Sequence, residues 1–143
     1  MNSEFRHIGI AVKNIEDSLF FYKKYFGFKI EKDLIEGGEY LQKFLKIKNI
    51  KARTIKLINK NSNVRLELLK FEKVNQNTHD IQISDFGLTH FSLTIDDIDN
   101  FYSTFIKNNI FCLSEPIISV DKKTKAMFCK DPNGVLIELV EVL

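Results

Sequence analysis

Two histidines and two glutamates have the residue types of a divalent-metal site: His7, Glu67, His90 and Glu138. Imidazole and carboxylate ligands together suit Zn, Ni, Co, Mn or Fe(II), whereas Ca would prefer more oxygen ligands. Four protein ligands would leave an octahedral metal open positions for water or substrate. We therefore expect one divalent metal ion per site. Secondary structure must bring the ligands together, because they span 132 positions (138 − 7 + 1).

The two histidines begin the two copies of an internal repeat. Residues 7–28 align with residues 90–111 at a constant offset of 83 (90 − 7), which places His7 on His90. Such self-similarity predicts two copies of one supersecondary unit. Each histidine therefore has the same position in its own copy.

The two glutamates also align, near the end of each copy. VRLELL at residues 64–69 resembles VLIELV at residues 135–140 with an offset of 71 (138 − 67), which places Glu67 on Glu138. This offset is 12 smaller than that of the histidines (83 − 71), so the first copy carries extra residues between its helix and its last strand. We predict that the segment 39–47 fills the difference with a short helix over the sheet.

Period-two alternation predicts that the four ligands point away from the side of their strands that the helices cover. The neighbours of the histidines on their own face are small or polar, namely Gly9, Ala11, Ser92 and Thr94. This face is therefore predicted to be a cavity rather than a core. Two carboxylates in one cavity would repel each other, and a dication would neutralise both.

A helix is expected after the first strand of each copy. Asn14 and Asp97 are the N-cap candidates, and Gly27 suits the exit of the first helix. Further strands are predicted near residues 29–33, 52–58, 111–113 and 125–130, and hairpin turns at residues 59–63 and 131–134. Each copy is thus βαβββ.

These elements predict an α+β fold in which two paired βαβββ modules form a curved mixed sheet around a metal-containing cavity. Residues 1–143 are expected to form a single domain. Its modules are about 5–71 and about 87–143, joined by a polar linker at about 72–86. The linker has no low-complexity character that would indicate two independent domains.

Composition argues against several classes of partner. The net charge is only +2, from 21 Lys and Arg against 19 Asp and Glu, so nucleic acid is not an expected partner. No apolar run approaches the roughly 18 residues of a membrane span. We expect a soluble, cytoplasmic protein whose two cysteines, Cys112 and Cys129, are reduced structural thiols, because they lack CxxC or zinc-finger spacing.

Each ligand also has an interpretation without a metal. A single histidine on a strand face can be a structural residue with its hydrogen bonds satisfied. Glu67 can form an ion pair with Arg65, or with Lys56 across the hairpin. The alignment of His7 with His90 and of Glu67 with Glu138 in the repeat favours the metal site.

The paired βαβββ units, the four-residue set and the closing DPNGVLIEL at residues 131–139 resemble the vicinal oxygen chelate superfamily. This superfamily includes glyoxalase I, methylmalonyl-CoA epimerase, extradiol dioxygenases and the fosfomycin and bleomycin resistance proteins. The resemblance covers nearly the whole chain and is more specific for fold and metal than for reaction. It implies a metal that binds two vicinal oxygens of a substrate.

The glutamate at position 67 is most similar to glyoxalase I, whose ligand set is His, Glu, His, Glu. That likeness implies a lyase or isomerase of the lactoylglutathione lyase type, which moves a proton next to a metal-bound carbonyl through an enediolate. Glu138 would act as the base and Glu67 would take the mirrored role. A methylmalonyl-CoA epimerase-like enzyme is an alternative within the same class. Such epimerases usually carry Gln at the position of Glu67 and a further Glu on the preceding strand, where residues 52–58 contain no acid.

Two other function classes stay open. An Fe(II) dioxygenase that cleaves a diol needs three open coordination positions on the metal, and a fourth protein ligand leaves fewer than three. A drug- or metabolite-binding resistance protein would not need the four ligands.

The substrate pocket has candidates but no clear set for glutathione. Arg65 and Lys56 could hold an anionic group, and Arg65 could equally form a surface salt bridge. Tyr40 and Phe44, in the extra helix, could form an apolar lid or pack in the core. We expect a homodimer with a small-molecule substrate, in which each site is built within one chain or across two.

Overall fold

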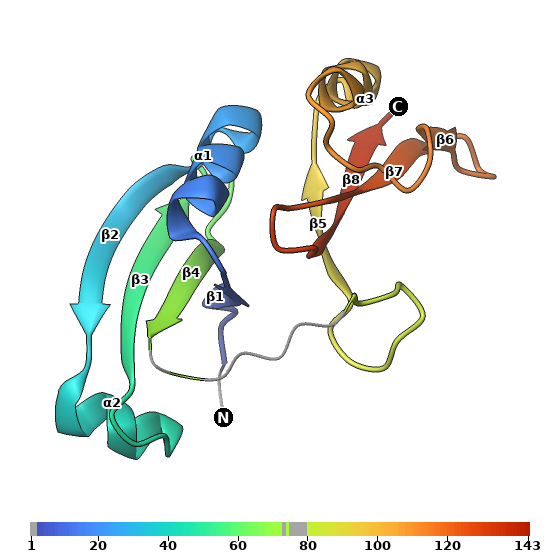
Figure 1. Ribbon diagram of the computed structural model, residues 1–143. Helices are drawn as coiled ribbons and strands as arrows, with labels where there is room; N and C mark the ends of the chain where they lie inside the picture. Colours follow the sequence, from blue (N-terminus) through green and yellow to red (C-terminus); the bar gives the residue numbers. More distant parts are fainter. Residues whose placement is uncertain (1–2, 73, 75–79) are drawn as a thin grey trace. The chain divides into compact units, whose positions relative to one another are not determined.

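The computed structural model describes residues 3–72, 74 and 80–143 of the chain (Figure 1). The strands and helices of these residues are β1 (His7–Ala11), α1 (Ile15–Phe26), β2 (Lys29–Glu36), α2 (Gly38–Leu45), β3 (Lys51–Ile58), β4 (Arg65–Glu72), β5 (His90–Thr94), α3 (Ile98–Lys107), β6 (Ile117–Ile118), β7 (Thr124–Lys130) and β8 (Leu136–Val142). They fall into two compact units, residues 1–77 and 78–143. The predicted α+β class is confirmed.

Each unit contains one four-stranded mixed sheet. The strand order is β1-β4-β3-β2 in the first sheet and β5-β8-β7-β6 in the second. In each unit the first strand in the sequence pairs in parallel with the last, β1 with β4 and β5 with β8, and the remaining pairs are antiparallel. We call β4 and β8 the closing strands. The two units therefore share one topology, as the repeat predicted.

Helix α1 begins and ends at the predicted caps. The Asn14 Oδ1 atom accepts hydrogen bonds from the backbone N–H groups of Glu16, at 3.0 Å, and Asp17, at 3.5 Å. At the other end Gly27 has φ 65°, a left-handed conformation that glycine adopts without steric cost. The Gly27 N–H donates to the Lys23 carbonyl at 3.2 Å. These contacts fix the direction in which the chain leaves the helix toward β2.

Each long helix covers the apolar face of its own sheet. Helix α1 packs on β4, and α3 packs on β7 and β8. The leucines and isoleucine that flank the two glutamates on the closing strands are almost fully buried there: Leu66, Leu68, Ile137 and Leu139. Alternation then sends both glutamates to the other face, as predicted.

The extra segment of the first copy forms α2, as predicted. Leu41 of this helix packs with Ile50 and Ala52 in a small apolar cluster at the beginning of β3, and Phe71 of β4 joins them. The chain turns sharply on both sides of the helix, with Gly38 at φ 74° and Lys46 at φ 59°. Helix α2 thus covers one end of the first sheet.

The second unit departs from the prediction before β7. The strand expected at residues 111–113 is reduced to an isolated bridge at Cys112, and the strand at this edge is β6, at Ile117–Ile118. Pro116 explains the interruption, because proline has no N–H to donate to a ladder and restricts the residue before it. The hairpin turns at residues 59–63 and 131–134 are found where predicted.

The predicted linker is only partly described. The third histidine of the chain, His79, is in this linker and lies outside the described residues. At the beginning of the second unit, Asp80 forms an ion pair with Lys130 of β7, with 2.5 Å between Oδ1 and Nζ. Over the part of the chain that the structure describes, no helix is long and apolar enough to cross a membrane.

Candidate metal site

The first unit brings His7 and Glu67 together on the face that α1 does not cover. Strands β1 and β4 pair in parallel with Gly9 opposite Glu67. The His7 Nε2 atom lies 3.4 Å from a carboxylate oxygen of Glu67. The Glu67 side chain is 12% exposed and that of His7 is 36% exposed, so both are accessible to a small ligand. We call this pair the first half-site.

The second unit repeats the register of the first. Strands β5 and β8 pair in parallel with Ser92 opposite Glu138, and Ser92 follows His90 by two residues as Gly9 follows His7. His90 and Glu138 therefore occupy the positions of His7 and Glu67 within their own unit. We call them the second half-site.

The surroundings of His90 favour a metal ligand through Nε2. The Thr89 hydroxyl oxygen lies 3.0 Å from Nδ1 of His90. If Nδ1–H donates to that oxygen, the lone pair of the imidazole remains on Nε2, which is how many metal-binding histidines are oriented. The ring of Phe128 meets the imidazole edge to face, with 5.2 Å between ring centres. Sequence reasoning missed Thr89 and Phe128, since neither lies in the segments that align between the two copies.

The donor atoms of the first half-site fit one divalent ion. Two ligands that each lie about 2.0–2.2 Å from one metal are separated by about 3.0–3.5 Å, and the His7–Glu67 distance falls in that range. Within the described residues, no group of three or more His, Cys, Asp and Glu side chains forms a complete site. Each unit supplies two of the four predicted ligands, so the full set needs both kinds of half-site.

The two half-sites differ at one neighbouring position. Lys56 of β3 stands opposite Glu67, and its Nζ lies 3.4 Å from Glu67 Oε1. In the second unit Phe128 of β7 stands opposite Glu138. One glutamate therefore has a cation as its cross-strand neighbour and the other has an aromatic ring. The predicted alternative pairing of Glu67 with Lys56 is present alongside the contact to His7.

Arg65 has a different partner from the one the sequence suggested. Its guanidinium donates two hydrogen bonds to the carboxylate of Glu31, at 2.6 and 2.7 Å. This bidentate contact lowers the pKa of Glu31, and the same contact raises the pKa of Arg65. Glu31 lies at an irregularity in the pairing of β2 with β3, which local sequence does not reveal. Arg65 is thus engaged in an ion pair, and Lys56 is the cation beside the half-site.

Tyr40 and Phe44 do not pack in the core. Their side chains are 71% and 69% exposed, and their rings stack on the outer side of α2 with 5.9 Å between centres. The buried position of this helix is Leu41 instead. The core-packing alternative is therefore wrong, whereas a role as a lid stays a prediction.

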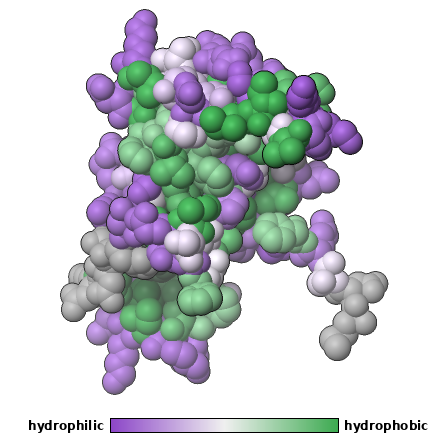
Figure 2. Space-filling model, turned by 90° about the vertical axis from the view of Figure 1, so that its right-hand side faces the viewer, coloured by the Kyte–Doolittle hydropathy of each residue, from purple (hydrophilic) through white to green (hydrophobic). Residues whose placement is uncertain are grey.

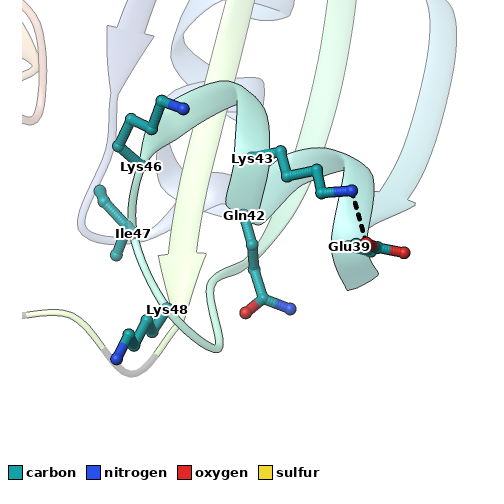
Figure 3. A pocket seen from close by; sticks show the side chains of 6 residues that line it. All are labelled: Glu39, Gln42, Lys43, Lys46, Ile47 and Lys48. Carbon is teal, nitrogen blue, oxygen red and sulfur yellow. Dashed lines mark ion pairs between the residues drawn. The ribbon is translucent and has the colours of Figure 1, made fainter.

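A hollow of about 360 Å³ lies beside the end of α2 rather than at either half-site (Figure 3). Its walls are mostly charged or polar: Glu39, Gln42, Lys43, Lys46, Ile47 and Lys48. Glu39 and Lys43 form an ion pair across one turn of the helix, with 2.5 Å between Oε1 and Nζ. None of these residues is a predicted ligand, and we assign no chemistry to this hollow.

Comparison with known proteins identifies the family of this chain. The sequence profile of the Glyoxalase/Bleomycin resistance protein/Dioxygenase superfamily matches residues 4–139, nearly the whole chain. The chain belongs to this superfamily. All four predicted ligands fall within the matched residues. A comparison with curated protein sequences finds no match.

Solved structures of superfamily members share the fold. A glyoxalase family protein from Bacillus cereus has a TM-score of 0.87 and 18% identity, over 99% of this chain and 97% of that chain. The trypanothione-dependent glyoxalase I of Leishmania major has a TM-score of 0.68 and 18% identity, over 98% and 87% of the two chains. A glyoxalase family protein from Enterococcus faecalis has a TM-score of 0.69 and 19% identity, over 96% and 97%. At these identities the likeness shows the vicinal oxygen chelate fold, and the superfamily includes many enzymes.

Proposed function

We propose that this protein is a metal-dependent lyase or isomerase of the glyoxalase I type, which moves a proton next to a carbonyl of its substrate. The observation that carries the proposal is the presence of a glutamate at both equivalent positions, with the same register to a histidine in each unit. Membership of the superfamily and the fold shared with a glyoxalase I support it.

The ligands of the metal would be His7, Glu67, His90 and Glu138, provided within one chain or by two chains. Zn, Ni, Co, Mn or Fe(II) all accept this nitrogen and oxygen set. When bound, the ion would polarise the substrate carbonyl and make the neighbouring C–H more acidic. The half-sites provide the donor atoms for this role without any thiolate.

The two glutamates would also transfer the proton. A carboxylate is the side chain that can accept a proton from carbon and return it to the adjacent carbon, provided it lies within hydrogen-bond reach. In this proposal Glu138 removes the proton and Glu67 acts on the opposite side of the substrate. Phe128 beside Glu138 would exclude water from that side.

Lys56 would bind an anionic group of the substrate. Its side chain is 25% exposed, and its ammonium group lies on the same face as the first half-site. Once a metal ion binds the Glu67 carboxylate, the ammonium group of Lys56 would be free to pair with an anionic substrate group, whereas Arg65 is already paired with Glu31.

Proton exchange with deuterated solvent tests the proposal directly. Metal-loaded protein is incubated in D₂O with a glutathione hemithioacetal or, separately, with an acyl-CoA thioester, and deuterium at the α-carbon is followed by NMR. We expect exchange that stops after dialysis against EDTA and returns with added metal.

Single substitutions then assign the base. Glu138→Gln should lower the exchange rate by about 10²–10⁴-fold, the usual effect of losing a general base. Glu115→Gln, in an exposed segment of the same unit, is the matched control and should not change the rate. Equal rates for Glu138→Gln and the parent would refute the assignment. Oxygen consumption without proton exchange would favour a dioxygenase, and metal-independent binding without exchange would favour a resistance protein.

A further inference from the structure

The two cysteines of the chain lie directly opposite each other. Cys112, in the segment after α3, forms an isolated antiparallel bridge with Cys129 of β7. Both are free thiols; Cys129 is fully buried and Cys112 is half-buried. Seventeen positions separate them in the sequence (129 − 112), and no motif relates them.

Backbone hydrogen bonds identify the kind of pair that the cysteines form. The Leu113 N–H donates to the Phe128 carbonyl at 2.9 Å, and the Lys130 N–H donates to the Phe111 carbonyl at 3.0 Å. These bonds flank the cysteines, so Cys112 and Cys129 are a non-hydrogen-bonded pair. Such pairs have Cα atoms about 4.5 Å apart and side chains on one face. That separation lies within the range of about 4.4–6.8 Å that a disulfide requires.

We propose that Cys112 and Cys129 form a reversible intrachain disulfide when the protein meets a peroxide. The backbone already holds the two residues in the relation that a cross-strand disulfide needs. The sequence alone had indicated two unrelated reduced thiols, because their spacing carries no signal.

The chemistry balances with hydrogen peroxide as the oxidant. The Cys112 thiolate attacks one peroxide oxygen, the O–O bond breaks, and Cys112 becomes a sulfenic acid as hydroxide leaves and is protonated to water. The Cys129 thiolate then attacks the Cys112 sulfur and releases the second oxygen, which also leaves as water. The two thiols lose two electrons, and the peroxide gains them. Cys112 acts first because it is the more accessible residue.

Burial of the two thiols slows this reaction at neutral pH. Desolvation raises the pKa of the Cys112 thiol. Desolvation, followed by the charges of Cys112 and Asp131, raises the pKa of Cys129 to about 12. Little thiolate is present at neutral pH, so oxidation should be slow there and faster in alkaline solution.

The disulfide would close a ring that contains β6. The ring spans 18 residues (129 − 112 + 1), and a ring of this size restricts the unfolded chain substantially. Phe128, which contacts the imidazole of His90, precedes Cys129 in β7. Oxidation would therefore stiffen the strand that supports the second half-site.

Mass spectrometry of the full-length protein tests the proposal. Reduced protein is treated with hydrogen peroxide, denatured, alkylated with iodoacetamide and mapped by peptides. We expect a peptide pair joined through Cys112 and Cys129, with neither thiol alkylated, and recovery of both thiols after dithiothreitol. The melting temperature should rise by roughly 5–10 °C on oxidation.

Cys112→Ser provides the control, because it keeps the buried thiol and removes its partner. This variant should show no joined peptides and no rise in melting temperature after peroxide. The proposal would be overturned if both cysteines of the parent remained open to alkylation. It would equally be overturned if Cys112 accumulated as sulfinic acid, or if the disulfide joined two chains.

Discussion

Lys56 gives the two glutamates of the proposed site different electrostatic surroundings. Its ammonium group lies 3.4 Å from Glu67, whereas Glu138 has Phe128 as its cross-strand neighbour. An ammonium group beside a carboxylate competes with a metal ion for the same oxygens and repels the ion. The same ammonium group can attract an anionic substrate group once the metal has taken Glu67.

Substitution Lys56→Met should therefore strengthen metal binding. We expect the zinc dissociation constant to fall by about 3–10-fold, because the substitution removes a positive charge beside the zinc ion at a partly exposed site. Competition with a chromophoric chelator measures it. Lys125→Met is the matched control, since Lys125 is similarly buried but pairs with Asp99 of α3. Weaker zinc binding in Lys56→Met would show that the lysine supports the ligand set instead.

The buried thiol of Cys129 should make the reduced protein less stable in alkaline solution. Burial first, then the charges of Cys112 and Asp131, raises the pKa of this thiol from 9.0 to about 12. A group with a raised pKa in the folded state stabilises the fold fully below its unfolded pKa, and this contribution is lost as pH rises through the folded pKa. The expected loss is about 1.4 kcal/mol per pH unit between the two pKa values.

Urea unfolding of the parent and of Cys129→Ala in reducing buffer, from about pH 8 to about pH 11, measures this contribution. The free energy of unfolding of the parent should fall toward that of the variant as pH rises. A difference between the two proteins that stays constant with pH would contradict the prediction.

At the level of elements, register is what makes the half-sites equivalent. In both units the glutamate of the closing strand stands opposite the residue two positions after the histidine. The apolar residues beside each glutamate pack under a helix, so a slip of one position would bury the glutamate and expose leucine. The helices therefore hold the histidines and glutamates of the proposed site on the open face.

The N-cap of α1 contributes to this support. Asn14→Ala should lower the free energy of unfolding by about 1 kcal/mol, because two backbone N–H groups lose their acceptor. Chemical denaturation measures the change. Asn14→Ser keeps an acceptor oxygen and should retain most of the stability. Equal losses in both variants would mean that Asn14 stabilises the protein through other contacts.

For the whole molecule, the prediction to test is that the two half-sites bind one ion together. We predict one divalent ion per chain, because a single His and Glu pair offers too few ligands for tight binding. His7→Ala and His90→Ala should each weaken zinc binding by at least about 10²-fold. Metal analysis and chelator competition measure both quantities. Two ions per chain, or full affinity in either variant, would show that the half-sites act separately.

A homodimer is the assembly that we predict. Among the described residues β1, β2, β5 and β6 are sheet edges, and open edges are usually covered in native assemblies. Hydrophobic side chains also appear among hydrophilic ones on the face in Figure 2. Light scattering should give a mass near 33 kDa (2 × 16.7 kDa). A mass of one chain at all concentrations would contradict this prediction.

Much of the candidate site could be predicted from the sequence alone. The repeat is found by aligning the sequence with itself, and alternation within each strand fixes which side chains share a face. The two His and Glu pairs and the βαβββ order could therefore be predicted without coordinates. The caps Asn14, Asp97 and Gly27 were accessible for the same reason, since their contacts lie within a few residues.

Only the tertiary structure decided the contacts between strands that are distant in sequence. It pairs Arg65 with Glu31 across the sheet, selects Lys56 rather than Arg65 as the cation beside Glu67, and sets Cys112 opposite Cys129. Each contact depends on the register between paired strands, and a bulge can shift that register without a local signal. The residue types of the proposed metal ligands were therefore evident from the sequence, whereas their charged and aromatic neighbours follow from strand pairing.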